Sequence, residues 1–250
     1  MKTKSTLSLV LAFAGLMTGY LYAQVAVEGE PTAKIGKGSL FETFASGGPV
    51  MWLILLCSLA MVAYAVERFM NLRSSVIFPE PFRRSYDEVF LKASKNKGDA
   101  SIFKPLVTDG KSEAERLFSR FFQRKYDNVR DMEEILQEYI EVTQWRIQKN
   151  VKPLGLITQI SPLLGLFGTV IGMIKAFDVV AEQGLGKPEL LANGMAVALL
   201  TTCFGIGVAI PASWLHHHFL EKSSRLTLML YTSVHELVLE WSSHRHDFTK

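Results

Sequence analysis

Cysteine is scarce in this 250-residue chain: only Cys57 and Cys203 are present, and each lies within a long apolar run. A structural disulfide is therefore not expected, and neither residue has the spacing of a metal-ligand set. The chain also lacks a GxxxxGKS/T loop, a nucleophile elbow and an HExxH motif. The sequence therefore contains none of these motifs for hydrolytic catalysis. We expect no enzymatic activity, no cofactor and no metal.

Charge of either sign is missing from residues 154–174 and again from residues 190–215, and a third apolar block covers residues 50–66. A hydrocarbon core of about 30 Å takes roughly 20 apolar residues in a helix. The sequence therefore predicts an all-α membrane protein with three transmembrane helices. The predicted spans are residues 49–70, 153–181 and 190–215. The net charge of +3 is small and mixed, so it gives no argument for a nucleic-acid partner.

The first 23 residues have the features of a signal peptide. Lys2 and Lys4 precede a short apolar core that ends at Leu21-Tyr22-Ala23, an imperfect small-residue cleavage site. A retained membrane anchor is the alternative interpretation. Both place residues 24–48 in the periplasm as an N-terminal segment.

Basic residues are distributed unevenly between the apolar blocks. Residues 68–152 contain seventeen Lys and Arg, whereas residues 24–48 contain only Lys34 and Lys37. The positive-inside rule therefore places the long segment in the cytoplasm. The predicted organisation is a cytoplasmic helical domain at residues 71–152, a periplasmic hairpin at residues 182–189 and a cytoplasmic C-terminal helix at residues 216–250.

Two of the spans are expected to continue beyond the membrane as long helices. From Met132 onward apolar residues recur at helical spacing, and we expect no break between Val129 and Lys152. Pro153 is expected to kink this helix at most, so that it runs on into the second span. The third span likewise continues into the C-terminal helix. Ser112 with Glu115 resembles a capping box that opens a further cytoplasmic helix.

The last two spans each separate bulky residues from small ones on opposite faces. The small faces are rich in glycine, alanine and hydroxyl residues, which has two compatible interpretations. Glycine and alanine let helix backbones approach, and threonine can bond to its own helix; alternatively, the hydroxyls line a lumen or meet an inserted helix. We assign packing to Gly165, Gly168, Gly172, Gly205 and Ala209. We assign channel lining or a proton path to Thr169, Thr202, Thr201, Thr158 and Ser161.

Three blocks of sequence carry a resemblance to a known family. They are WLILLCSLAMVAYAVERF, SPLLGLFGTVIGMIKAF and GMAVALLTTCFGIGVAIPA. In this order they resemble the ExbB/TolQ/MotA proton-channel family, and its ExbB branch most closely. The resemblance covers the three spans and the long intracellular segment. The pair Glu67-Arg68, at the inner end of the first span, also looks like the family's own.

The resemblance implies a multi-pass subunit of the bacterial inner membrane, with its N-terminus in the periplasm and its C-terminus in the cytoplasm. Such subunits form a homo-oligomeric ring in the lipid bilayer, typically a pentamer, around the helices of an ExbD-like single-span partner. Proton flux between ring and partner then delivers work to a TonB-like protein for transport across the outer membrane. The family's channel threonines correspond to Thr169 and Thr202.

One departure from the family pattern bears on mechanism. ExbB proteins often carry a glutamate in the turn before the threonine of the third span, and Val197 stands at that place here. An ionisable residue within the membrane is the usual proton carrier, so the titrating group is expected to be the membrane aspartate of an ExbD-like partner. Two alternatives stay open: a TolQ-like or MotA-like motor with a different load, and a non-conducting membrane scaffold.

Overall fold

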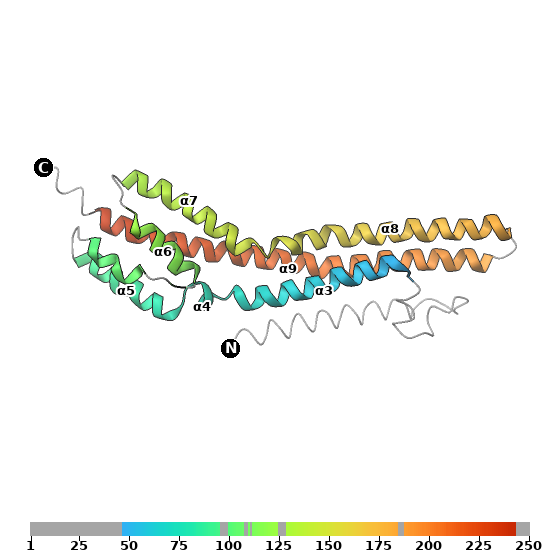
Figure 1. Ribbon diagram of the computed structural model, residues 1–250, viewed down its shortest axis with the longest axis horizontal. Coiled ribbons are helices and arrows are strands. Elements are labelled where there is room, and N and C mark those ends of the chain that lie inside the picture. Colours follow the sequence, from blue (N-terminus) through green and yellow to red (C-terminus); the bar gives the residue numbers. More distant parts are fainter. Residues whose placement is uncertain are drawn as a thin grey trace. The chain divides into compact units, whose positions relative to one another are not determined.

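The computed structural model describes residues 47–95, 100–107, 110, 112–124, 129–184 and 188–243, and these residues contain helices but no strand (Figure 1). The elements are α3 (Pro49–Asn71), α4 (Ser74–Ile77), α5 (Glu80–Lys95), the 3-10 helix η2 (Ala100–Leu106), α6 (Glu113–Gln123), α7 (Val129–Gln148), α8 (Lys152–Gln183) and α9 (Pro188–Ser243). The expected signal peptide and most of the periplasmic segment, residues 1–46, lie outside the described residues, as do residues 185–187 of the hairpin.

Three of these helices, α3, α8 and α9, are long and apolar enough to cross a membrane. Their exposed side chains include Leu56, Leu163 and Leu199, which are 66%, 62% and 69% exposed. Apolar surface on this scale suits lipid or another protein rather than water. The predicted fold class, an all-α protein with three such helices, is confirmed.

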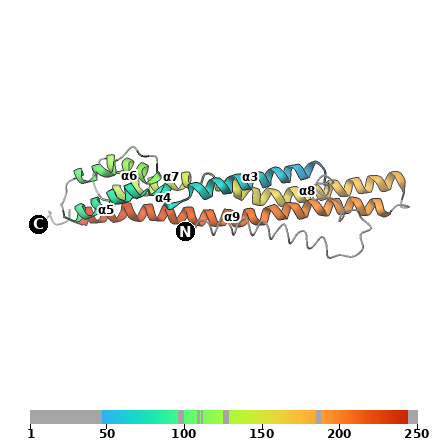
Figure 2. The same ribbon diagram turned by 90° about the horizontal axis from the view of Figure 1, so that it is seen from below.

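The chain divides into two compact units. Unit 1 consists of the described residues up to 63 and residues 153–215, and unit 2 consists of residues 64–152 and the described residues from 216 onward. In unit 1 α8 and α9 lie side by side and antiparallel (Figures 1 and 2). The first turns of α3 pack on both of them, through Val50, Met51 and Ile54.

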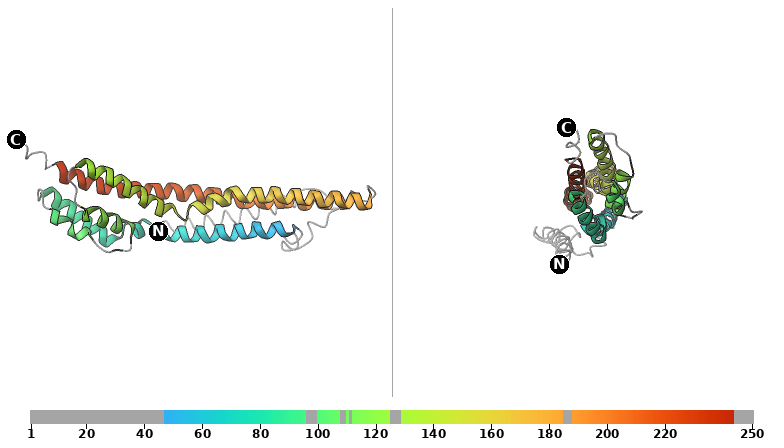
Figure 3. Two further views of the ribbon diagram at one scale, coloured as in Figure 1. Left: turned by 45° about the horizontal axis from the view of Figure 1, so that its top comes forward. Right: turned by 90° about the vertical axis from the view of Figure 1, so that its left-hand side faces the viewer.

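Unit 2 is built on a cluster of aromatic rings. η2 packs against α5 and α6, and α6 packs against α7, in the green part of the ribbon (Figure 3). Phe82 of α5 meets Phe118 of α6 edge to face, with ring centroids 5.2 Å apart, and Phe118 is fully buried. The predicted capping box is confirmed: the Ser112 hydroxyl accepts from the Glu115 N–H at 3.1 Å, and the Glu115 carboxylate accepts from the Ser112 N–H at 3.0 Å.

The long helix expected before the second span is interrupted. α7 ends at Gln148, a turn follows at residues 149–151, and α8 begins at Lys152. In an unbroken helix the N–H of residue 153 would bond to the carbonyl of residue 149, and Pro153 has no N–H. Pro153 instead lies in the first turn of α8, where no helical acceptor is required. The expectation of no break between Val129 and Lys152 was wrong, whereas α9 does continue for 56 residues.

Candidate functional site

The closest approach of α8 and α9 is made by their glycines. A Cβ atom on Gly205 would lie 2.6 Å from the Ser161 carbonyl oxygen, and one on Gly165 would lie 2.9 Å from the Thr202 Cα. Real Cβ atoms do not come this near to backbone, so only glycine is compatible with the observed spacing. A Cβ atom on Gly168 would meet the Thr201 side chain, and one on Gly172 would lie 2.8 Å from the Ala198 Cβ; Ala209 is buried.

Two hydroxyl groups of α9 reach across to one carbonyl of α8. The Thr201 hydroxyl donates to the Gly165 carbonyl at 3.2 Å and to the Ala198 carbonyl at 2.7 Å. The Thr202 hydroxyl donates to the same Gly165 carbonyl at 3.1 Å. The absence of a side chain at Gly165 makes this approach possible. The α8–α9 contact therefore combines bare backbone with two hydrogen bonds from adjacent threonines.

The two threonines of α8, in contrast, donate hydrogen bonds within their own helix. The Thr169 hydroxyl donates to the Leu166 carbonyl at 2.6 Å, and the Thr158 hydroxyl donates to the Leu154 carbonyl at 3.0 Å. Each hydroxyl has one proton to donate and two lone pairs with which to accept. With the proton directed at a backbone carbonyl, the oxygen of each threonine remains available as an acceptor.

The five residues assigned to channel lining do not share one surface of the single chain. Thr201 and Ser161 are 1% and 0% exposed and lie within the protein interior, whereas Thr169, Thr202 and Thr158 are partly exposed. The Ser161 hydroxyl has no hydrogen-bond partner among the described residues. Of the five side chains, those of Thr169, Thr202 and Thr158 are therefore accessible on the single chain.

Val197 lines a hollow of about 190 Å³ between the first turn of α3 and the α8–α9 pair. Gly168, Gly172 and Gly194 contribute bare backbone to it, and Lys175 and Asn193 contribute the polar side chains. No local sequence pattern indicates this hollow, because it is formed where three separate helices meet. The position at which the family often has a glutamate thus faces space rather than a tightly packed neighbour.

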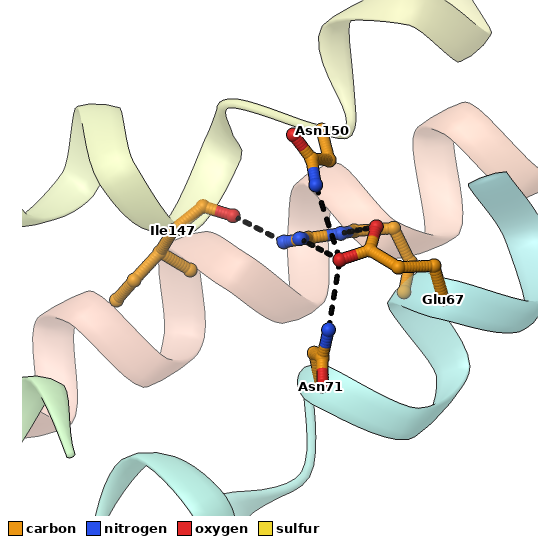
Figure 4. Close-up of polar contacts among 5 residues, drawn as sticks. Glu67, Asn71, Ile147 and Asn150 are labelled. Atoms are coloured by element: carbon orange, nitrogen blue, oxygen red, sulfur yellow. Dashed lines mark hydrogen bonds and ion pairs between the residues drawn. The ribbon is translucent and has the colours of Figure 1, made fainter. Parts of the chain in front are cut away.

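The pair Glu67-Arg68 lies in a polar cluster of unit 2, shown in Figure 4. Arg68 is 8% exposed; it donates to both carboxylate oxygens of Glu67, at 2.9 and 2.6 Å, and to the Ile147 carbonyl at 3.0 Å. The side-chain amides of Asn71 and Asn150 donate to the Glu67 carboxylate at 2.8 and 3.0 Å. The end of α3 is thereby fastened to the turn between α7 and α8.

Glu67 and Arg68 were singled out from the sequence, whereas the two asparagines of this cluster were not. Asn150 is separated from Glu67 by 83 positions, and a lone asparagine carries no periodic signal. Asn150 lies in the turn of residues 149–151, three positions before Pro153. Among the described residues no group of His, Cys, Asp and Glu is arranged to hold a metal ion.

The sequence of residues 109–231 matches a family model described as the MotA/TolQ/ExbB proton channel family. This protein belongs to that family. A match of this kind, on a chain with three helices long and apolar enough to cross a membrane, makes it a multi-pass membrane protein of the ExbB/TolQ type.

Curated relatives carry both ExbB and TolQ names. The chain is 27% identical to a biopolymer transport protein ExbB homolog of Methanothermobacter thermautotrophicus over 69% of this chain and 60% of that protein. It is 30% identical to biopolymer transport protein ExbB of Aquifex aeolicus, over 36% of this chain and 60% of that protein. It is 31% identical to the Tol-Pal system protein TolQ of Pseudomonas aeruginosa, over 41% of this chain and 45% of that protein. The matches thus span about half of the relatives' length.

Proposed function

We propose that this protein is an ExbB-like subunit that conducts protons together with an ExbD-like single-span partner and so drives a TonB-like protein. The observation that carries the proposal is the pair of partly exposed hydroxyls, Thr169 and Thr202, on otherwise uncharged stretches of α8 and α9. Both direct their protons to backbone carbonyls. Their oxygens can then accept a hydrogen bond from water or from a protonated carboxyl group.

The protein supplies no carboxylate of its own between residues 154 and 174 or between residues 190 and 215. The titrating acid therefore comes from the partner helix, for which the family offers a membrane aspartate. Moving one charge across 100 mV releases about 2.3 kcal/mol, enough to bias a conformational cycle. In this proposal several copies, a pentamer by family resemblance, surround the partner helices in the lipid bilayer.

The proposed topology follows from the basic residues. Seventeen Lys and Arg between positions 68 and 152 favour the cytoplasm for this segment. The N-terminal segment and the hairpin between α8 and α9 are then periplasmic, and the end of α9 is cytoplasmic. Fusing a reporter of cytoplasmic or periplasmic location after residue 243 tests this orientation, and a periplasmic signal there would reverse it.

Valine substitutions at Thr169 and Thr202 test the conducting role, because valine keeps the volume and removes the hydroxyl. Each variant replaces the chromosomal copy, and two quantities are measured: uptake that depends on the proton motive force, and the size of the detergent-solubilised complex. We expect uptake to be abolished while the complex remains assembled. Full uptake in both variants would refute the assignment.

Thr201→Val is the matched control. Thr201 donates to the same Gly165 carbonyl as Thr202 but is 1% exposed, so it shares the packing role without being accessible to a partner. We expect this variant to retain uptake. Equal loss in Thr201→Val and Thr202→Val, with smaller complexes, would show that the hydroxyls matter for packing alone.

Two other functions are favoured by particular observations. The identity to TolQ proteins favours a motor of the same design with a different load. Val197, in place of a membrane carboxylate, favours a non-conducting scaffold. A pH-sensitive dye inside vesicles that hold the protein and its single-span partner separates the scaffold from both motors, since only a motor acidifies or alkalises the lumen when a potential is applied.

A further inference from the structure

The hollow that Val197 lines in unit 1 is large enough to hold part of another molecule. It measures about 190 Å³ and is bordered by the first turn of α3, by α8 and by α9. One water needs only about 10–15 Å³, and an apolar cavity of about 150 Å³ holds a molecule as large as benzene. A helix, with a diameter of about 10 Å, is too wide to enter this space. The hollow therefore suits a narrow, flexible chain.

The lining of the hollow changes from polar to apolar along its length. Lys175 and Asn193 bring the polar side chains, and both lie toward the hairpin that joins α8 to α9. Gly168, Ile171 and Val197 line the part farther from the hairpin, and positions 168 and 175 are roughly 10 Å apart along α8. Water is a poor occupant of this deeper part, because a buried water needs about two to four polar partners.

Lys175 lies at the depth expected for lipid headgroups. No charged residue lies between Lys152, the first residue of α8, and Lys175. These two lysines are roughly 35 Å apart along the helix, slightly more than the hydrocarbon core of about 30 Å. Lys175 is exposed and makes no ion pair with any residue that the structure describes. A lysine at such a depth lays its apolar stem along the helix and extends its ammonium group to the headgroups.

We propose that the hollow binds one phospholipid, with the phosphate on Lys175 and Asn193 and the beginning of one acyl chain in the apolar part. The Lys175 ammonium supplies a charged donor and the Asn193 amide supplies two neutral ones. The order of polar rim and apolar depth is the order of headgroup and tail in a lipid. The site is independent of proton conduction. The proposed topology places it in the outer leaflet, and a reversed topology would change the leaflet but not the binding.

The test crosslinks a lipid to the full-length protein in dodecyl maltoside, a detergent without phosphate. Two probes are titrated: a phosphatidylethanolamine with a photoreactive diazirine on one acyl chain, and a diacylglycerol with the same chain and no phosphate. Peptide mass spectrometry locates the crosslinked residues after illumination. Crosslinking at the exposed Leu163 of α8 serves as the reference for unspecific contact. We expect the phosphate-bearing probe to crosslink Ile171 or Val197 at about tenfold lower concentration than the diacylglycerol.

Two variants test the two halves of the site. Val197→Phe fills the hollow, and Val170→Phe is its matched control, because Val170 is exposed on α8 and does not line the hollow. We expect Val197→Phe to lose the crosslinks in the hollow and Val170→Phe to keep them. Lys175→Gln should remove the preference for the phosphate-bearing probe, and Lys175→Arg should retain it. Lys92→Gln on α5 removes the same charge elsewhere and should shift neither titration by more than about twofold.

The size of the detergent-solubilised complex shows that each variant is folded, and Lys175→Gln remains informative if Val197→Phe is not. Equal titrations of the two probes in the natural protein would overturn the proposal, as would equal crosslinking in Val197→Phe and Val170→Phe. A photoreactive amino acid placed at position 197 gives the last outcome. If it captures another protein chain and no lipid, a neighbouring chain fills the hollow and the proposal is wrong.

Discussion

Unit 1 and unit 2 hold distant segments together by opposite means. Between α8 and α9 in unit 1, bare backbone meets backbone, and the polar contacts are neutral hydroxyls on the Gly165 carbonyl. At the end of α3 in unit 2, a buried guanidinium joins a carboxylate, a carbonyl and, through Glu67, two amides. The α8–α9 contact depends on the absence of side chains at a few glycines. The contact at the end of α3 depends on the presence of charged and amide side chains.

The difference follows from the surroundings that each contact requires. A charged pair within hydrocarbon is costly, whereas small residues and hydroxyl bonds to backbone stabilise helix pairs there without charge. At the boundary of a span, water and headgroups lower the cost of an ion pair. Unit 1 should therefore be sensitive to added volume, and unit 2 should be sensitive to removed polar groups.

Adding one methyl group at Gly205 should give the largest effect. The Cβ of Gly205→Ala would lie 2.6 Å from the Ser161 carbonyl oxygen and 3.1 Å from the Gly165 Cα, so the helices must separate. We expect destabilisation at the upper end of roughly 1–3 kcal/mol, against a gain of about 1 kcal/mol that alanine gives in an unobstructed helix. Denaturant titration of the detergent-solubilised protein, followed by circular dichroism, measures it.

Ser213→Thr is the control for this substitution, since it adds one methyl group to an exposed position of the same helix. It should leave the unfolding midpoint within experimental error. A more stable Gly205→Ala protein would mean that the α8–α9 contact is looser than described.

Removing the buried guanidinium should have the next largest effect. Arg68→Met keeps an apolar stem of similar length and leaves Glu67 without its charged partner. We expect a loss of about 2 kcal/mol, below the 3–5 kcal/mol found for fully buried pairs, because the Glu67 side chain is 34% exposed. Hydrogen exchange should accelerate at the turn of residues 149–151, which the cluster fastens.

The exposed pair Arg225–Glu221 on α9 provides the comparison. Its side chains are 77% and 57% exposed, so Arg225→Met should change stability by less than about 0.5 kcal/mol. Similar losses in the two variants would remove the distinction between a structural cluster and an ordinary surface ion pair.

Loss of the capping box should have a smaller effect. Ser112→Ala leaves the Glu115 N–H unsatisfied at the start of α6, which typically costs about 1 kcal/mol. The measurement is hydrogen exchange in the first turn of α6 together with the unfolding midpoint. Ser112→Asp restores an oxygen acceptor and should recover most of the loss; no recovery would assign the effect to burial of Ser112 instead.

Tyr86→Phe should have the smallest effect at neutral pH, about 0.5–1 kcal/mol, through the lost bond from the Tyr86 hydroxyl to the Ser233 carbonyl at 3.0 Å. Burial raises the pKa of Tyr86 to about 12, and the charges of Glu236 and Asp87 add to the shift. In the unfolded chain tyrosine titrates near pH 10. The stability that depends on the neutral phenol is therefore complete below pH 10 and is lost between pH 10 and 12.

The Tyr86→Phe variant has no phenol group to titrate at this position. The stability difference between the natural protein and Tyr86→Phe should accordingly shrink and then reverse as pH rises from 9 to 12, in paired unfolding curves. A difference that is independent of pH would mean that the Tyr86 hydroxyl is exposed to solvent.

Local patterns were sufficient to predict the three apolar helices and the capping box, because hydropathy and the Ser112–Glu115 spacing are local signals. These local patterns do not predict which face of α9 is buried. Thr201 and Thr202 are adjacent, and only the rotation of the helix decides that one is 1% exposed and the other partly exposed.

The polar cluster and the helix break were missed for a related reason. Pro153 cannot donate a hydrogen bond to the carbonyl of Lys149, four residues earlier. The helix therefore breaks before the proline and not at it. Asn150 and Glu67 are 83 positions apart, and no periodicity links them. Contacts of this kind depend on tertiary structure, which local patterns do not encode.

The hydrogen bonds between α8 and α9 also bear on how the chain folds. They join residues only 36 and 37 positions apart, whereas α3 meets the same pair through Met51 and residues such as Phe204, far later in the chain. Contacts between near neighbours in sequence form faster, because a shorter loop has to be closed. The short loop favours closure of the α8–α9 hairpin before α3 docks on it.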